Sequence, residues 1–231
     1  MLNAVINDLF LSLEMESTQT LPVLDAVELR VLGVLMEKSK TTPEYYPMTI
    51  NAITLACNQK TSRKPVVQYD DQTVILALDT LKRKGLVSTA TGGSSRSVKY
   101  KHNFAIVFPV LPQDVTIICL LMLRGPQTPG ELNTNSGRMY EFETLDEVQE
   151  VLERLSAPEM PYVMQLPKRP GQKEVRYAHL LGGIPDLTQI DLQDEVSNNR
   201  PSSELESRLS KVEQELSDLK EAFDKLMQEL S

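Results

Sequence analysis

One five-residue phrase occurs twice in the chain, and it limits the fold more than any other feature. Residues 98–102 read Val-Lys-Tyr-Lys-His and residues 175–179 read Val-Arg-Tyr-Ala-His, so the two copies lie 77 residues apart. An apolar stripe with helical spacing also recurs, at an offset of 74 residues: Val74, Leu78 and Leu81 match Val148, Leu152 and Leu155. The sequence therefore predicts a tandem duplication of one structural unit.

The only two histidines of the chain, His102 and His179, stand at the ends of the two phrases. Two histidines could indicate a metal site, but zinc needs three or four protein ligands. The two cysteines, Cys57 and Cys119, lie in different repeats and have no short ligand spacing. We expect both histidines to be structural, and the chain to need no metal and no other cofactor.

Each repeat reads as three helices followed by a two-stranded hairpin. Dense or periodic apolar residues, bounded by Asp, Pro and Gly, predict the helices of both repeats: 24–38, 48–57 and 71–84, then 110–125, 128–133 and 144–156. Alternating apolar residues on either side of a Gly-containing turn predict the strands: 86–91, 97–104, 162–168 and 174–181. The fold class is therefore mainly α with small β-hairpins, which is an α+β fold.

Three helices and a hairpin are the order of a winged helix-turn-helix domain, in which the third helix commonly enters the DNA major groove and the hairpin forms the wing. We expect two such domains in tandem and a C-terminal coiled-coil helix. The expected segments are an N-terminal arm, the first and second winged-helix domains, a linker and the coiled-coil helix: 1–20, 21–108, 109–184, 185–202 and 203–231.

The first repeat resembles the YceH-like family of uncharacterised bacterial proteins. The phrases that carry the resemblance are Glu37-Lys38, Thr42-Pro43-Glu44, Tyr46-Pro47, Asn51-Ala52, Cys57-Asn58-Gln59-Lys60 with Arg63, Pro65 and Val66, and the run from Leu78 to Leu86. The similarity covers roughly residues 21 to 182, and the Cys-Asn-Gln-Lys phrase is its most specific part. The resemblance implies two winged-helix domains in tandem and no established biochemical activity.

The charges are distributed unevenly along the chain. The net charge is −8, yet residues 59–102 hold nine basic residues against three acidic ones. Cations concentrated on one unit are what contact with DNA phosphates requires. The third helix of the second repeat carries carboxylates instead: Asp146, Glu147, Glu150 and Glu153. We therefore expect the second domain to pack against the first or to bind a protein.

The stretch 58–70 between the second and third helices is much longer than the three or four residues usual in a helix-turn-helix. Insertions of this length are often functional, and the alternative is a plain surface loop. The candidate DNA-binding residues lie in this loop, at the end of the third helix and on the wing: Lys60, Arg63, Lys64, Lys82, Arg83, Arg96 and Lys99. Asp70 and Asp71, which begin the third helix, argue against base readout there.

The sequence predicts no enzyme, because it contains no phosphate-binding glycine loop, nucleophile elbow or zinc-protease phrase. Cys57 ends the apolar face of a helix, so we expect it in the core. The leading hypothesis is a DNA-associated regulatory protein that uses the first winged helix for contacts to the DNA backbone. The alternative is a protein-interaction adaptor built from tandem winged helices.

The C-terminal segment has the spacing of a coiled coil. Apolar residues alternate at steps of four and three along it: Leu205, Leu209, Val212, Leu216, Leu219, Phe223, Leu226 and Leu230. Such a heptad seam predicts a coiled-coil homodimer without deciding whether its helices are parallel, and the alternative is a single helix that folds back on the body. With two unpaired cysteines, no signal peptide and no apolar run long enough to cross a membrane, we expect a cytoplasmic protein.

Overall fold

The structure is a computed structural model, and it describes residues 21–90, 97–168 and 174–185, together with 211, 212, 214 and 220. Contacts divide the chain into two units, residues 1–185 and 186–231. Both repeats fall in the first unit, and the described residues of the second unit are helical. The predicted N-terminal arm, the linker and every residue of the heptad seam except Val212 lie outside the described residues. The coiled coil, the homodimer and the domain boundary at residue 108 therefore stay predictions.

The first repeat contains the predicted helices and hairpin in the predicted order. Its elements are α2 (Ala26–Thr41), the short 3₁₀ helix η1 (Pro43–Tyr45), α3 (Ile50–Cys57), α4 (Asp71–Arg83), β1 (Val87–Ala90) and β2 (Lys99–His102). Side chains at the helix starts satisfy free backbone N–H groups: Asp25 accepts from Glu28, Thr49 from Ala52 and Asp70 from Thr73. Gly85 follows α4 with a φ of 73°, a conformation that ends the helix and favours glycine.

The second repeat has the same order of elements in fewer residues. A short helix that sequence analysis did not predict, α5 (Phe104–Val107), leads into it. It then contains α6 (Pro112–Arg124), α7 (Pro129–Ser136), α8 (Leu145–Leu155), β3 (Val163–Gln165) and β4 (Tyr177–His179). The described part of the chain therefore has seven α-helices and two antiparallel strand pairs, and none of its helices is long and apolar enough to cross a membrane.

The strand pairing explains why the two five-residue phrases match. In the first hairpin Val87 pairs with His102, and in the second Val163 pairs with His179. The central tyrosine of each phrase also forms an isolated antiparallel bridge to the segment before the second helix of its repeat, Met48 with Tyr100 and Gln127 with Tyr177. Each phrase thus holds a third chain segment against its hairpin, so several residues of the phrase are constrained by backbone pairing.

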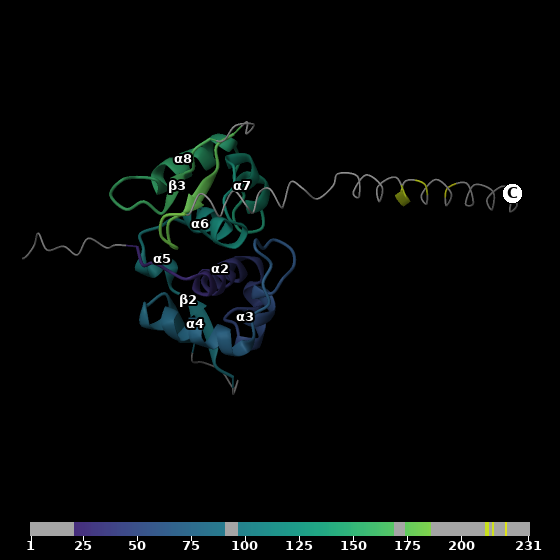
Figure 1. Cartoon of the computed structure of the whole chain (residues 1–231), viewed down its shortest axis with the longest axis vertical. Coiled ribbons are helices and arrows are strands. Elements are labelled where there is room, and N and C mark those ends of the chain that lie inside the picture. The colour runs from purple at the N-terminus through teal and green to yellow at the C-terminus, as the bar shows by residue number, and fades with distance from the viewer. Residues whose placement is uncertain are drawn as a thin grey trace, which may run out of the picture. The chain divides into compact units, whose positions relative to one another are not determined.

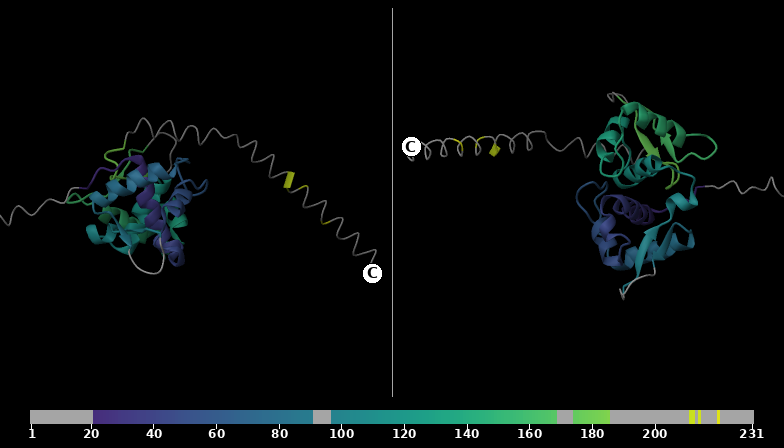
Figure 2. Two further views of the ribbon diagram at one scale, coloured as in Figure 1. Left: turned by 90° about the horizontal axis from the view of Figure 1, so that it is seen from below. Right: turned by 180° about the vertical axis from the view of Figure 1, so that it is seen from behind.

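The two repeats share one apolar core, and the first helix of each repeat lies at its centre. Helices α2 and α6 pack side by side between the remaining helices (Figure 1, Figure 2). Gly33 allows their close approach, because a Cβ atom there would lie 2.9 Å from Leu123 Cδ2. On the same contact the Cys119 thiol donates a hydrogen bond to the carbonyl oxygen of Gly33, with a distance of 3.2 Å. The core therefore continues from one repeat into the other.

Replacing Gly33 with Leu is expected to lower the free energy of unfolding by about 1–3 kcal/mol, since the new side chain must displace Leu123 and Met122 from a packed contact. Urea unfolding followed by circular dichroism measures the change. Gly137→Leu is the matched control, because no atom lies within 4 Å of a Cβ at that position. Equal stability of the Gly33→Leu variant and the wild type would show that α2 and α6 do not meet at Gly33.

Candidate functional site

Arg63 lies inside the protein, although sequence analysis placed it on a surface loop. Its guanidinium forms a double ion pair with Glu37, with Nη1 3.0 Å from Oε1 and Nη2 2.6 Å from Oε2. The other donors bind the carbonyl oxygens of Ala56 and Ser62 and the side-chain oxygen of Gln59. All five N–H groups of an arginine are thereby used.

The prediction that Arg63 contacts DNA phosphates is therefore wrong. Its side chain is 0% exposed, and its donors already have partners within the protein. Burial raises the pKa of Glu37, but the hydrogen bonds and the charge of Arg63 outweigh that effect and hold the pKa below its ordinary value. The Glu37 carboxylate consequently remains ionised at neutral pH. A local charge count could not reveal this, because Glu37 lies 26 residues before Arg63 in the sequence.

The long loop 58–70 connects the two repeats. Within the first repeat, the buried side chain of Arg30 donates hydrogen bonds to two carbonyl oxygens. One belongs to Cys57, just before the loop, and the other to Pro65, near its middle. Across to the second repeat, the backbone N–H of Lys64 donates to the carbonyl oxygen of Leu123 at 2.9 Å. Arg124 at the end of α6 donates to the Ser62 hydroxyl at 2.9 Å. The insertion thus has a structural role that the plain surface-loop interpretation did not include.

The other candidate DNA-binding residues have different surroundings. Lys60 is exposed on the loop, whereas Lys64 is half-buried. At the end of α4 both Lys82 and Arg83 are exposed; Lys82 lies 3.7 Å from Asp79, and Arg83 donates to the Thr80 hydroxyl. Lys99 is half-buried on β2. Arg96 lies outside the described residues.

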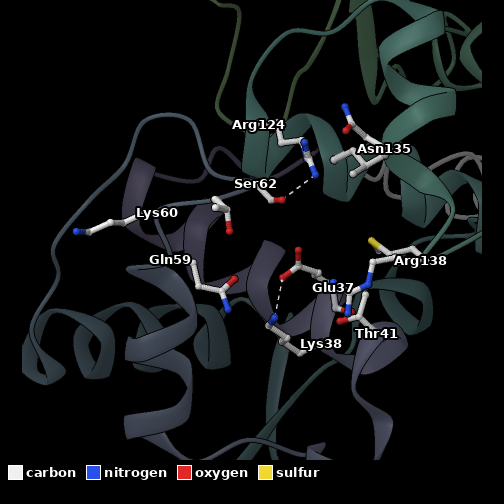
Figure 3. Close-up of a pocket in the computed structure, with 12 residues that line it drawn as sticks. Glu37, Lys38, Thr41, Gln59, Lys60, Ser62, Arg124, Asn135 and Arg138 are labelled. Carbon is white, nitrogen blue, oxygen red and sulfur yellow. Dashed lines mark hydrogen bonds and ion pairs between the residues drawn. The ribbon is translucent and has the colours of Figure 1, made fainter. Parts of the chain in front are cut away.

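A polar pocket of about 330 Å³ lies at the junction of the two repeats. Its walls come from the end of α2, the loop 58–70, α6 and the end of α7 with the turn that follows, and most of the lining side chains are charged or polar: Glu37, Lys38, Thr41, Gln59, Lys60, Thr61, Ser62, Leu120, Arg124, Asn135, Arg138 and Met139. Figure 3 shows Arg124 reaching into the pocket from above and Arg138 from the right, with Glu37 near the centre. No motif in the sequence predicts this site.

Positive charge exceeds negative charge in the pocket. Four of the lining residues are cationic and Glu37 is the one acidic residue among them. Glu37 is already neutralised by buried Arg63, and Lys38 lies 3.5 Å from it. Burial lowers the pKa of Arg124, but an arginine with this shift still carries its charge at neutral pH. The surroundings of the pocket are therefore suited to an anion.

Neither cysteine has the properties of a nucleophile. Burial raises the pKa of Cys57 to about 12 and that of Cys119 further still, so both thiols are protonated at neutral pH. Cys57 lies in the core, as predicted. Among the described residues no three His, Cys, Asp or Glu side chains come together as metal ligands would. His102 accepts a hydrogen bond from the Phe104 N–H at Nδ1 and contacts the Ser39 hydroxyl at Nε2, within the fold.

Comparison with known proteins gives a consistent result. Residues 24–172 match the model of a family described as a protein of unknown function, DUF480. A UPF0502 protein of Opitutus terrae is 48% identical over 174 residues, which cover 75% of this chain and 76% of that protein. UPF0502 proteins of Shewanella sp. strain MR-4 and of Aliivibrio salmonicida are 43% and 42% identical, and the matches cover 88% and 89% of this chain and 97% and 96% of those proteins.

Proposed function

This chain belongs to the DUF480 family of uncharacterised proteins, also named UPF0502, and we propose that it is a non-enzymatic, DNA-associated regulatory protein. In this proposal each repeat is a winged helix-turn-helix domain, with α4 and α8 as the third helices and the two hairpins as the wings. The first repeat contacts the DNA backbone through the outward side of α4 and β2. The second repeat does not contact DNA.

The difference in charge between equivalent surfaces carries the proposal. In the first repeat Lys99 and Lys101 alternate with buried Tyr100, so both project from the outward side of β2, and neither has an ion-pair partner among the described residues. The equivalent residues of the second repeat are Arg176, which forms an ion pair with Glu131 at 2.9 Å, and Ala178. Cations without a protein partner remain available to phosphates.

The third helices of the two repeats, α4 and α8, also differ in charge, and again the second repeat is the more acidic. The outward stripe of α4 contains Gln72, Leu76, Asp79 and Arg83, and Lys82 is exposed beside it, 3.7 Å from Asp79. Glutamine and arginine can both donate hydrogen bonds to base edges in the major groove. The exposed side of α8 instead carries Asp146, Glu150 and Glu153, which phosphates would repel. Figure 1 shows α4 with β2 on one side of the α2/α6 pair and α8 with β3 on the other.

Replacing Lys99 and Lys101 with Gln is expected to weaken binding to unrelated duplex sequences by similar factors, because phosphate contacts carry no direct base information. The slope of log affinity against log salt should flatten by about 0.9 for each lost contact. Fluorescence anisotropy with a labelled duplex at several salt concentrations measures both effects. Lys168→Gln, which removes an exposed lysine from the hairpin of the second repeat, should leave the slope unchanged.

Two results would contradict the DNA proposal. The first is a wild-type protein that shows no salt-dependent binding to duplex DNA. The second is a Lys99→Gln/Lys101→Gln variant whose slope equals that of the wild type. In either case the adaptor function takes its place, and one observation favours it: Leu55 on α3 and Leu76 on α4 are 65% and 60% exposed, and exposed apolar side chains can contact a protein partner.

A further inference from the structure

We propose that the pocket at the junction of the repeats binds a small organic molecule that carries one or more phosphate groups. This goes beyond the proposed contact with DNA, because the pocket and the outward side of α4 and β2 share no residue. The proposal rests on three observations: the charge of the lining, the state of its cations and the size of the space.

The charge of the lining is positive because its one carboxylate is already neutralised. Arg63, which does not line the pocket, gives Glu37 two charge-assisted hydrogen bonds, so Glu37 does not compensate the other cations in full. Lys38, Arg124 and Arg138 remain, from α2, α6 and the turn after α7. Lys60 lines the rim, and Figure 3 shows its side chain pointing away from the others. We therefore leave Lys60 out of the proposed contacts.

The two arginines that line the pocket are available to a ligand. Arg138 forms no hydrogen bond or ion pair with any described residue, and it is exposed. Arg124 uses one Nη atom for the Ser62 hydroxyl, which leaves its other donors for a ligand. Guanidinium groups bind phosphate oxygens in pairs of parallel hydrogen bonds, in a geometry that lysine cannot offer. The hydroxyl groups of Thr41, Thr61 and Ser62 add further donors around the same space.

The size of the space favours an organic phosphate over a simple ion. About 330 Å³ falls at the lower end of the range for pockets that bind small molecules. A single inorganic ion between the two arginines would leave much of this volume to water. Leu120 and Met139 provide the apolar part of the lining, where the carbon skeleton of a ligand could lie.

A ligand in this pocket would connect the two repeats. It would contact α2 and the loop 58–70 of the first repeat and α6 and the turn after α7 of the second. The chain already joins these segments through the bonds from Lys64 to Leu123 and from Arg124 to Ser62. Because a ligand that binds the folded state alone stabilises it, occupancy should raise the unfolding temperature of the whole unit.

The test uses the full chain, isothermal titration calorimetry and thermal unfolding, with glucose 6-phosphate and pyrophosphate as probes. Glucose is the uncharged control, citrate is the non-phosphate anion, and sodium chloride at matched ionic strength controls for screening. We expect saturable binding of at least one phosphate probe to one site per chain, with an increase in unfolding temperature. Glucose should not bind, and citrate should bind at least about tenfold more weakly than the phosphate probe.

Arg138→Gln and Arg124→Gln test whether the phosphate probe occupies this pocket. Each should weaken its binding by about tenfold or more, since each removes charge-assisted hydrogen bonds. Arg83→Gln is the matched control: it removes an exposed arginine that does not line the pocket and should leave the affinity unchanged. Arg138 has no bond within the described fold, so its variant stays folded even if Arg124→Gln does not.

Three results would overturn the proposal: binding of neither phosphate probe, binding of citrate as tight as that of the phosphates, or unchanged affinity in the Arg138→Gln variant. None of these results depends on DNA. A failure of the pocket proposal is therefore distinguishable from a failure of the proposed DNA association, and each can hold without the other.

Discussion

Replacing Arg63 with Met is expected to lower the free energy of unfolding by about 3–5 kcal/mol, the range for removing one partner of a buried ion pair. The Glu37 side chain is 16% exposed, so its carboxylate would keep its charge with little water to solvate it. The carbonyl oxygens of Ala56 and Ser62 would each lose a donor as well. Urea unfolding at neutral pH, followed by circular dichroism, measures the loss.

The double variant Glu37→Gln/Arg63→Met separates the ion pair from the other effects of the substitution. Removing both charges should recover part of the stability, because no isolated charge then remains in the buried site. Arg83→Met is the matched control, since it removes an exposed arginine and should change stability by less than about 0.5 kcal/mol. If Arg63→Met lowers the free energy of unfolding by no more than Arg83→Met does, the ion pair does not stabilise the loop.

Acid is expected to destabilise the protein between about pH 6.5 and pH 4, because both histidines are buried in the neutral form. Burial lowers the pKa of His102 to about 4 and that of His179 to about 4, whereas an unfolded histidine titrates near 6.5. In this window the unfolded state binds more protons than the folded state, so stability rises with pH. The contribution is complete above about pH 6.5 and is lost as the pH falls towards 4.

The expected size is roughly 3 kcal/mol for each histidine, at about 1.4 kcal/mol per pH unit of pKa shift. The His102→Gln/His179→Gln variant should lose this dependence, so its curve of stability against pH should be flatter from 6.5 to 4. Glu37 also loses its charge as the pH falls, but it is present in both proteins and cancels in the comparison. Equal slopes for the two proteins would show that neither histidine is buried in the neutral form.

Most of the fold could be predicted from the sequence, because its signals are local. Each of these signals depends on residues a few positions apart. They are the helix caps Asp25 and Asp70, the apolar stripes, and Gly85, which ends α4. Because the five-residue phrase is duplicated, the order of elements in the second repeat could be predicted from the order in the first repeat. The resemblance to a family of uncharacterised bacterial proteins is confirmed by the family match.

The candidate site could not be predicted in the same way, because its parts meet only in the folded chain. Lys38, Arg124 and Arg138 come from three separate segments with no common motif. Arg63 looked like one cation of a basic surface loop, and its partner Glu37 lies in the predicted helix 24–38, far from that loop in the sequence. One signal was available: the stretch between the second and third helices is longer in the first repeat, 58–70, than in the second, 137–144, which indicates a role for the extra residues beyond the shared fold.

The contact between Gly33 and Cys119 has a consequence for how such a chain could arise. Each of these residues lies eight positions after the N-cap of its helix, Asp25 for α2 and Leu111 for α6. Equivalent positions meet themselves in this way on the axis of a twofold-symmetric homodimer. At this contact the two repeats meet as two identical subunits would. A symmetric homodimer presents every surface twice, whereas a chain that arose by duplication can alter one copy alone. The third helices here do differ: α4 exposes Lys82 and Arg83, and α8 exposes Asp146, Glu150 and Glu153.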